Sequence, residues 1–287
     1  MEFQKNDIID LSIIITTYQR PEILLNLITS INNSKVPSKE IIIVGTSESD
    51  FSKLPKNLSF IKIISKVKNQ IYQRNLGIKK ARGKYLLQVD DDIIFDKNAI
   101  NIMFQNIVNS NDKTIFSINL LNSYGQEANV RWTKIYNSKI TFRIVLYILN
   151  GFKKIQPASI ILSGRPIPNY LSVGDKNYEK NQWLNSCIIL KKSSLKDYKN
   201  YYISGKSFYE DIITTHNFYL SNYKLIVLKN AKAYHPITPP MNFTTHLKTL
   251  KSQFLIVKIF KKSYFLFLLD IIIFSFIFLF YNFYKYK

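Results

Sequence analysis

Apolar runs of strand length alternate with helical patterns over the first ninety residues of this 287-residue chain. The runs rich in Ile, Leu and Val, which predict buried strands, cover residues 12–16, 40–44, 60–64 and 85–89. Between them, apolar spacing predicts a helix that begins at Pro21 and a second over 71–82, closed by Gly83. Strands that alternate with helices favour an α/β fold with a mostly parallel sheet.

The rest of the chain is less regular up to residue 234. We expect helices at 96–109 and 207–221 and strands at 114–121, 186–190, 224–227 and 231–234. Residues 122–182 mix both patterns, with glycine and proline around 164–168, and predict no particular element.

The C-terminus carries the most apolar stretch of the chain. Residues 264–284 include fifteen Leu, Ile and Phe, and a helix of this length would cover about 30 Å. Insertion of these side chains into a bilayer contributes roughly −4 to −9 kcal/mol, against about +3 for a central aspartate such as Asp270. The stretch therefore predicts a transmembrane helix over 263–284, with a very apolar core or interfacial helix as the alternative.

Lysines flank this stretch unevenly. Five precede it between residues 248 and 262, whereas only Lys285 and Lys287 follow, so the positive-inside rule places the main domain in the cytoplasm. Leu247, Leu250, Phe254 and Val257 recur at helical spacing among the preceding lysines, as in an interfacial helix on anionic lipid. We therefore expect a single-pass protein of the cell membrane. Its predicted parts are a catalytic-sized domain at 1–245, a basic amphipathic segment at 246–262, the anchor at 263–284 and a tail at 285–287.

The composition restricts the classes of partner. Forty basic residues against 19 acidic ones give a formal charge of +21, which favours phospholipid surfaces, nucleotide phosphates or nucleic acid. The sequence contains no helix-turn-helix, zinc-finger or RNP-like pattern, so we expect no nucleic-acid partner. Cys187 is the only cysteine, which excludes an intramolecular disulfide and a cysteine-rich zinc site.

Three consecutive carboxylates, Asp90, Asp91 and Asp92, follow the predicted strand at 85–89. Ligands of open α/β sheets bind beyond the carboxyl ends of the strands, and adjacent carboxylates repel one another unless a cation lies nearby. The pattern favours a divalent metal, with a solvated acidic turn as the alternative.

These motifs, in this order, resemble a family 2 glycosyltransferase of the GT-A fold over roughly residues 10–240. Residues 12–21 resemble the first strand and nucleotide loop, and 73–92 the segment that runs into the DXD motif. Residues 163–164 and 183–192 are similar to the acceptor-side segment. Tyr209-Glu210-Asp211 and Ala233-Tyr234-His235-Pro236 are similar to the ED motif and the late histidine.

The resemblance implies a role for each motif. Asp90 and Asp92, with His235, would hold Mg²⁺ or Mn²⁺, and Asp91 would lie near the ribose. Asp211 would be the general base of an inverting transfer, and Glu210 would help to position the acceptor. The remaining site residues are Thr17, Tyr18, Arg20 and Arg74, which would meet the donor base or phosphates, and Trp183 and Asn185, which would meet the acceptor.

Several of these residues have a plain structural reading as well. Glu210 and Asp211 would complement the dipole of a helix that begins there. Tyr18 and Trp183 could be packed aromatics, and the arginines solvated charges.

One departure from the family pattern concerns the donor base. Acidic residues that contact the base commonly follow the second strand, but here Gly45 and Thr46 stand there, with Asp50 further along. The sequence therefore names neither the nucleotide nor the sugar of the donor.

The predicted function is transfer of a sugar from a nucleotide-sugar donor to a lipid-linked saccharide, in surface polysaccharide or lipopolysaccharide assembly. The alternative is a membrane-tethered protein that binds nucleotide sugars or saccharides without turnover. A nucleotidyltransferase is disfavoured because no glycine-rich phosphate loop follows the first strand.

Overall fold

The computed structural model describes residues 8–121, 140–167, 177, 179–185, 187–199, 201, 208–235 and 243–285, with residues 278–285 described by their backbone alone. The chain forms two compact units. Unit 1 comprises residues 1–128 and 172–239, and unit 2 comprises 129–171 and 240–287. Residues 186, 207, 236 and 286–287, which belong to predicted segments or motifs, lie outside the described residues.

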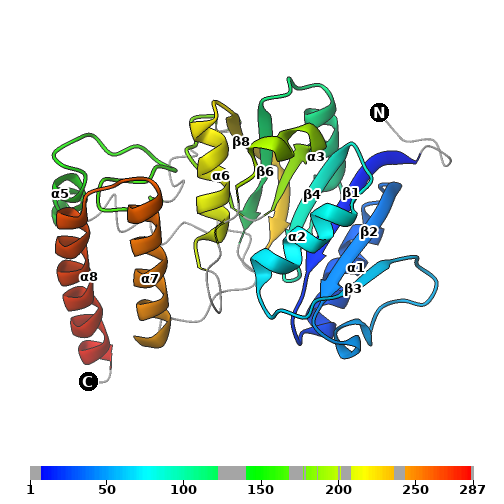
Figure 1. Cartoon of the computed structure of the whole chain (residues 1–287), viewed down its shortest axis with the longest axis horizontal. Coiled ribbons are helices and arrows are strands. Elements are labelled where there is room, and N and C mark those ends of the chain that lie inside the picture. The colour runs from blue at the N-terminus through cyan, green and yellow to red at the C-terminus, as the bar shows by residue number, and fades with distance from the viewer. Residues whose placement is uncertain are drawn as a thin grey trace. The chain divides into compact units, whose positions relative to one another are not determined.

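Unit 1 is built on one eight-stranded sheet with the order β3-β2-β1-β4-β7-β6-β8-β5 (Figure 1). The four strands β3, β2, β1 and β4 pair parallel with one another, and β6 pairs parallel with β8. Strand β7 pairs antiparallel with β4 and β6, and β5 pairs antiparallel with β8. The strand bounds are β1 Ile9–Thr16, β2 Ser38–Gly45, β3 Ile61–Ile64, β4 Tyr85–Asp90, β5 Ile94–Phe95, β6 Thr114–Leu121, β7 Ile188–Lys191 and β8 Lys224–Tyr234. The predicted mostly parallel α/β sheet is confirmed.

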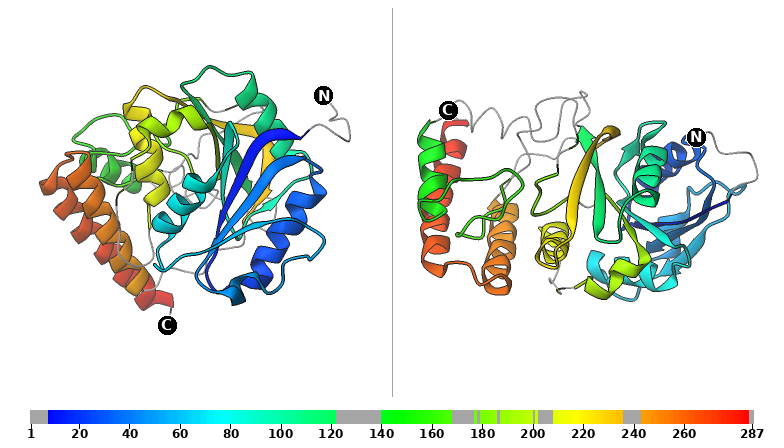
Figure 2. Two further views of the ribbon diagram at one scale, coloured as in Figure 1. Left: turned by 45° about the vertical axis from the view of Figure 1, so that its right-hand side comes forward. Right: turned by 90° about the horizontal axis from the view of Figure 1, so that it is seen from above.

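Helices cover both faces of this sheet (Figure 2). The apolar side chains of α1 (Pro21–Asn33) and α3 (Ala99–Val108) pack on one face, and those of α2 (Gln70–Lys80) and α6 (Glu210–Leu220) on the other. Single 3₁₀ turns follow β2 and β7, namely η1 (Glu48–Phe51) and η2 (Lys192–Asp197). Because side chains alternate along β1, Ile13 and Ile15 enter the first core and Ile14 enters the second.

The predicted elements of this unit lie where the pattern put them, with two differences. The expected strands at 224–227 and 231–234 form one continuous strand, β8, whose pairing with β6 shifts register between Ile118 and Asn119. A bulge of this kind lets one strand contain residues that break the alternation. The two-residue strand β5 was not predicted, because it is too short to show a period.

The described residues of unit 2 form three helices, α5 (Ile140–Leu149), α7 (Phe243–Ile259) and α8 (Tyr264–Lys285), and the last two lie side by side in Figure 1. Its core contains Leu146 and Leu149 of α5, Ile161 and Ile167, and side chains of α8 such as Ile273. Gly164 has a φ of +80°, and a Cβ there would lie 2.5 Å from Val257 of α7, so no larger residue fits this turn.

The C-terminal helix is present where it was predicted, but its predicted role is not supported. Within the described part of the chain, no helix combines the length and the apolar character needed to cross a membrane. Asp270, the acidic residue within this apolar helix, is paired with polar residues of unit 2. Asp270 is fully buried, accepts hydrogen bonds from Ser163 Oγ (2.8 Å) and Arg165 Nε (2.9 Å), and forms an ion pair with Arg165. Asp270 is thus neutralised within unit 2.

Candidate active site

The site lies in unit 1, where the carboxyl ends of β1 and β4 meet the first residues of α6. Thr16 pairs with Asp90 in the sheet, so the residues that follow the two strands are neighbours. Thr17 Oγ1 donates to Asp91 Oδ2 at 2.7 Å, and Arg20 forms ion pairs with Asp91 and, at 3.1 Å, with Asp92. The sequence-predicted Thr17, Arg20, Asp91 and Asp92 therefore form one hydrogen-bonded group.

Asp91 is the buried member of this group and contacts both Thr17 and Arg20. Its side chain is fully buried, and burial raises its pKa to about 6, although the Arg20 charge and the Thr17 hydroxyl oppose the rise. A buried carboxylate that is satisfied by two protein donors fixes the loop after β1 against the turn after β4. Asp92, with 17% of its side chain exposed, is the more accessible of the two carboxylates.

Arg74 links the two acidic motifs of the sequence. It extends from α2 with only 3% of its side chain exposed, and it donates to Asp90 Oδ1 at 2.9 Å and to Glu210 Oε1. Burial alone would lower the pKa of Arg74, but the charges of Glu210 and Asp90 raise it, so the guanidinium stays charged. Gln70 Nε2 also donates to Asp90 Oδ1 at 2.9 Å.

Arg74 engages two of its N–H donors with Asp90 and Glu210, and it thereby positions both carboxylates. The expected contact of Arg74 with the base or phosphates of the donor stays a prediction. Asp90, expected to ligate a metal, has one oxygen engaged by Gln70 and Arg74.

Glu210 and Asp211 begin α6 but have different surroundings. Glu210 is 5% exposed and paired with Arg74, whereas Asp211 is half-buried and accepts a hydrogen bond from Ile212 N at 2.9 Å. Burial, together with the nearby charge of Glu210, raises the pKa of Asp211 to about 7. A carboxylate with this pKa can accept a proton at neutral pH.

Tyr209 precedes them in a left-handed backbone conformation, with a φ of 60°. This conformation costs a non-glycine residue of the order of 1 kcal/mol and is frequent at functional sites. No sequence pattern indicated it.

Asp92 and His235 form the part of the site that could bind a cation. The imidazole Nε2 lies 3.4 Å from Asp92 Oδ1, and His235 follows β8, where its N–H donates to Leu121 O at 2.8 Å. Burial would raise the pKa of Asp92, but His235 and Arg20 together lower it. The described residues contain no group of three or more His, Cys, Asp or Glu side chains that could hold a metal. One carboxylate and one imidazole nevertheless suit an ion whose other ligands are phosphate oxygens and water.

The loop after β1 is held by residues that the sequence did not single out for a role. Gln73 Nε2 donates to Thr17 O (2.9 Å) and Val44 O (3.1 Å), which ties α2 to the ends of β1 and β2. Asp50 Oδ1 accepts from Gln19 N at 2.6 Å, and its Oδ2 accepts from Thr46 N at the same distance. Asp50 is fully buried, so it supports the loop and offers nothing to a base. The only signal in the sequence was its place a few residues after the second strand.

Tyr18 is the exposed member of that loop. Its ring is 41% exposed, and Lys68 Nζ lies 5.5 Å from the ring centroid. An accessible aromatic face beside a cation is suited to stacking on a nucleobase.

The predicted acceptor-side residues differ from each other. Leu184, beside Trp183, donates its N–H to Thr215 Oγ1 at 2.9 Å, and Thr215 donates to Asp211 O at 2.7 Å, so this segment is fixed to the first turn of α6. The indole Nε1 of Trp183 is buried and has no acceptor among the described residues. Asn185 instead accepts from Ser117 Oγ at 2.5 Å and from Cys187 N at 3.2 Å, so its amide is engaged within the sheet.

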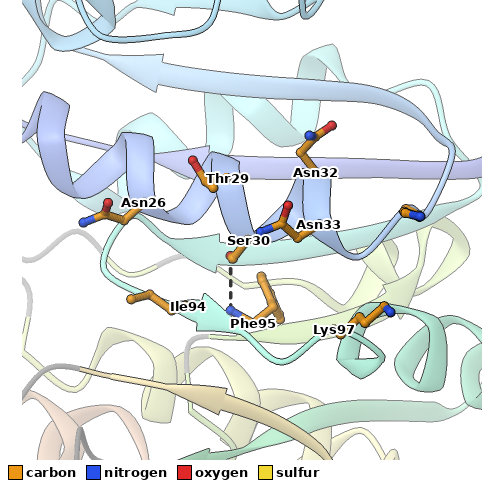
Figure 3. Close-up of a pocket in the computed structure, with 9 residues that line it drawn as sticks. Asn26, Thr29, Ser30, Asn32, Asn33, Ile94, Phe95 and Lys97 are labelled. Atoms are coloured by element: carbon orange, nitrogen blue, oxygen red, sulfur yellow. Dashed lines mark hydrogen bonds between the residues drawn. The ribbon is translucent and has the colours of Figure 1, made fainter.

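A separate groove of about 820 Å³ lies between α1 and β5 (Figure 3). Its polar lining includes Asn26, Asn33 and Lys97, and Ser30 Oγ accepts a hydrogen bond from Phe95 N across its floor. None of the carboxylates described above lines it.

The comparisons with known proteins agree with this geometry. The model of the family described as "Glycosyl transferase family 2" matches residues 12–161. A search of curated proteins found no match.

Solved structures share the fold at low identity. S. aureus TarS 1–349 aligns with a TM-score of 0.52 and 16% identity, over 86% of this chain and 64% of its own. The same protein in complex with UDP-GlcNAc aligns with a TM-score of 0.52 and 17% identity, over 82% of this chain and 60% of its own. GalNAc-T7 with UDP, GalNAc and Mn²⁺ aligns with a TM-score of 0.55 and 11% identity, over 89% of this chain and 48% of its own. This chain thus spans about half to two thirds of the lengths of these structures.

The α/β sheet, the carboxylates at the ends of β4 and at the start of α6, and the family match over 150 residues lead to one conclusion. This chain belongs to glycosyl transferase family 2 and has a GT-A-like fold.

Proposed function

We propose that the protein is an inverting glycosyltransferase that moves a sugar from a nucleotide-sugar donor to a saccharide acceptor. The observation that carries this proposal is the buried Arg74, which joins Asp90 at the end of β4 to Glu210 at the start of α6. Through it, the donor-side and acceptor-side carboxylates occupy one site. A binding protein without turnover would not need a carboxylate whose pKa is raised to about 7, as that of Asp211 is.

The donor would lie over the loop after β1. Tyr18 would stack on the base, and Arg20, held at Asp91 and Asp92, would meet the phosphates. The complex of TarS with UDP-GlcNAc and that of GalNAc-T7 with UDP support a nucleotide-sugar donor for this chain.

Asp92 and His235 would hold Mg²⁺ or Mn²⁺, with Asp90 close by. The Mn²⁺ in GalNAc-T7 supports a divalent ion here. When bound, such an ion would neutralise negative charge on the departing nucleoside diphosphate.

Asp211 would act as the general base. As a hydroxyl oxygen of the acceptor forms a bond to the anomeric carbon, the bond from that carbon to the diphosphate oxygen breaks, and the hydroxyl proton passes to a carboxylate oxygen of Asp211. Attack on the face opposite the leaving group inverts the configuration. Glu210, fixed by Arg74, would keep the Asp211 pKa raised and orient the acceptor.

The acceptor that we propose is a lipid-linked saccharide at the cytoplasmic face of the cell membrane, within surface polysaccharide or lipopolysaccharide assembly. The charge of +21 favours an anionic surface, and an acceptor confined to that surface would meet the enzyme at a raised effective concentration. Trp183, fixed near Asp211 through Thr215, is the residue we expect to contact the acceptor sugar.

The test is the variant Asp211→Asn, assayed with UDP-GlcNAc, UDP-GalNAc and the dTDP- and GDP-sugars as donors and alkyl glycosides as acceptors. We expect nucleoside diphosphate release to fall at least about 100-fold, because a general base contributes that much, while donor affinity stays within about twofold. Asp96→Asn, which makes the same change at an exposed position outside the site, is the matched control. Unchanged turnover in Asp211→Asn would exclude it as the base. Absence of turnover in the wild type, with donor binding intact, would favour the binding protein.

A further inference from the structure

Unit 2 exposes large apolar side chains in regular stripes. On α8, Phe265, Leu268, Ile272 and Phe276 are between 58% and 75% exposed. At about 100° per residue, these four positions fall within an arc of about 80° on one side of the helix. On the opposite side, Phe267 and Asp270 are buried. The helix therefore has a second apolar face that no described part of unit 2 covers.

The exposed face of α7 has a different composition. Phe243, Leu247 and Phe254 are 59%, 50% and 46% exposed and share one side of the helix with the exposed Lys251 and Lys258. Apolar and aromatic groups alternate there with lysines whose long stems can reach outward while their ammonium groups stay in water.

The two stripes meet where α7 passes into α8. The ring of Phe254 lies 6.1 Å from the ring of Tyr264, measured between centroids, and Tyr264 is itself 52% exposed. Together they make a continuous surface, here called the α7–α8 face. Contiguous exposed apolar surface of this kind marks a binding site for a protein or a membrane.

The charge of unit 2 favours a membrane over a second copy of the chain as the partner of this face. The described segments of unit 2, residues 140–167 and 243–285, contain ten basic residues and one acidic residue, Asp270, which is buried in its pair with Arg165. A second copy docked on the same face would bring like charges together. A bilayer that contains anionic phospholipid supplies both an apolar interior for the phenylalanines and negative phosphates for the lysines.

We infer that the α7–α8 face docks unit 2 peripherally on an anionic phospholipid surface, with α7 and α8 lying in the plane of the headgroups. The apolar stripes would enter the boundary between headgroups and acyl chains, and Lys248, Lys251 and Lys258 would contact the phosphates. This inference deepens the proposed membrane location and rests on unit 2 alone. It holds whether or not unit 1 transfers sugar.

The test is co-sedimentation of the full chain with vesicles, without donor or acceptor. We expect binding to vesicles of phosphatidylcholine mixed with phosphatidylglycerol and much weaker binding to phosphatidylcholine alone. Lys248→Gln, Lys251→Gln and Lys258→Gln together should weaken binding roughly 100-fold, at about fivefold per lysine. Phe265→Ser with Ile272→Ser should weaken it at least as much, since two large apolar groups are lost.

Matched controls come from exposed positions of unit 1. Lys56→Gln, Lys79→Gln and Lys80→Gln, and separately Val108→Ser with Leu220→Ser, should leave binding within about threefold. All variants change exposed side chains, and circular dichroism verifies their folding.

Several results would overturn the inference. Equal binding to both vesicle types, no binding to either, or a loss with the unit 1 variants equal to that with the unit 2 variants would each exclude the α7–α8 face as an anionic-lipid site. Self-association abolished by Phe265→Ser, without vesicle binding, would assign the face to a second copy. Bound protein that resists extraction by salt and alkaline carbonate would show a spanning helix, not peripheral docking. Donor binding measured in parallel reports on unit 1, so failure of the proposed function and failure of docking are distinguishable.

Discussion

At the scale of single residues, the site depends on carboxylates kept in different states by their neighbours. Asp211, with a pKa raised from an ordinary 3.8 to about 7, is protonated over part of the physiological pH range. The pKa of Asp92 is lowered by His235 and Arg20, so this carboxylate stays ionised. A base and an anion can therefore act in the same site near neutral pH.

The pKa of Asp211 predicts the pH dependence of turnover. The base must be ionised to accept a proton, so kcat/KM should fall about tenfold per unit as the pH drops below about 7 and level off above it. Steady-state rates between pH 5 and 9 measure this, with donor affinity followed across the same range as the control. A limb that falls only near pH 4 would mean that burial does not raise this pKa.

Arg74 should matter for stability as well as geometry. Arg74→Ala leaves Glu210 buried without its partner, and breaking a buried pair costs about 3–5 kcal/mol. Lys39→Ala, which breaks an exposed pair with Asp10, should cost no more than about 1 kcal/mol. Urea unfolding of both variants measures the difference. Equal losses would show that Arg74 is not the link between the two motifs.

At the scale of elements, close packing of α2 on the sheet sets the position of Arg74. A Cβ on Gly77 would lie 2.5 Å from Ile14 Cγ2 of β1, so the helix can approach the sheet only without a side chain there. Gly77→Ala should therefore destabilise the protein by about 1–3 kcal/mol, although alanine favours helices. Lys80→Ala, at an exposed position of α2, is the control for helix propensity. A stabilised Gly77→Ala in thermal unfolding would contradict the packing described.

Sequence periodicity predicted most of unit 1 because its strands are buried on both faces and its helices have one apolar side. The helix α1 illustrates this, since its predicted apolar positions Leu24, Leu27, Ile28 and Ile31 are all buried. It did not predict α5, because the sequence ITFRIVLYIL is rich in β-branched and aromatic residues, which favour strands as much as helices. The carboxylates and His235 could be found from their motifs. The linking roles of Gln73, Arg74 and Asp50 could not, because each depends on a contact with a residue at least 29 positions away, which leaves no local signal.

At the scale of the whole molecule, each unit has its own core and its own buried ion pair. Asp270→Ala leaves the nearly buried Arg165 without its carboxylate, which should cost unit 2 about 3–5 kcal/mol. Hydrogen exchange should then show lost protection in α5, α7 and α8 with unit 1 unchanged. Glu179→Ala, which breaks an exposed pair with Lys224 in unit 1, is the control. Protection lost equally in both units would mean that they unfold as one.

The division of unit 2 along the chain has a consequence for biosynthesis. The last residue of α5 is Leu149 and the first of α8 is Tyr264, so about 115 residues must be made between the two halves of one core. At 5–20 residues per second, a ribosome needs roughly 6 to 23 seconds for this stretch. During that time the apolar side of α5 has no partner from α8, so a nascent chain stalled between these helices should be bound by holdase chaperones and released once α8 has emerged.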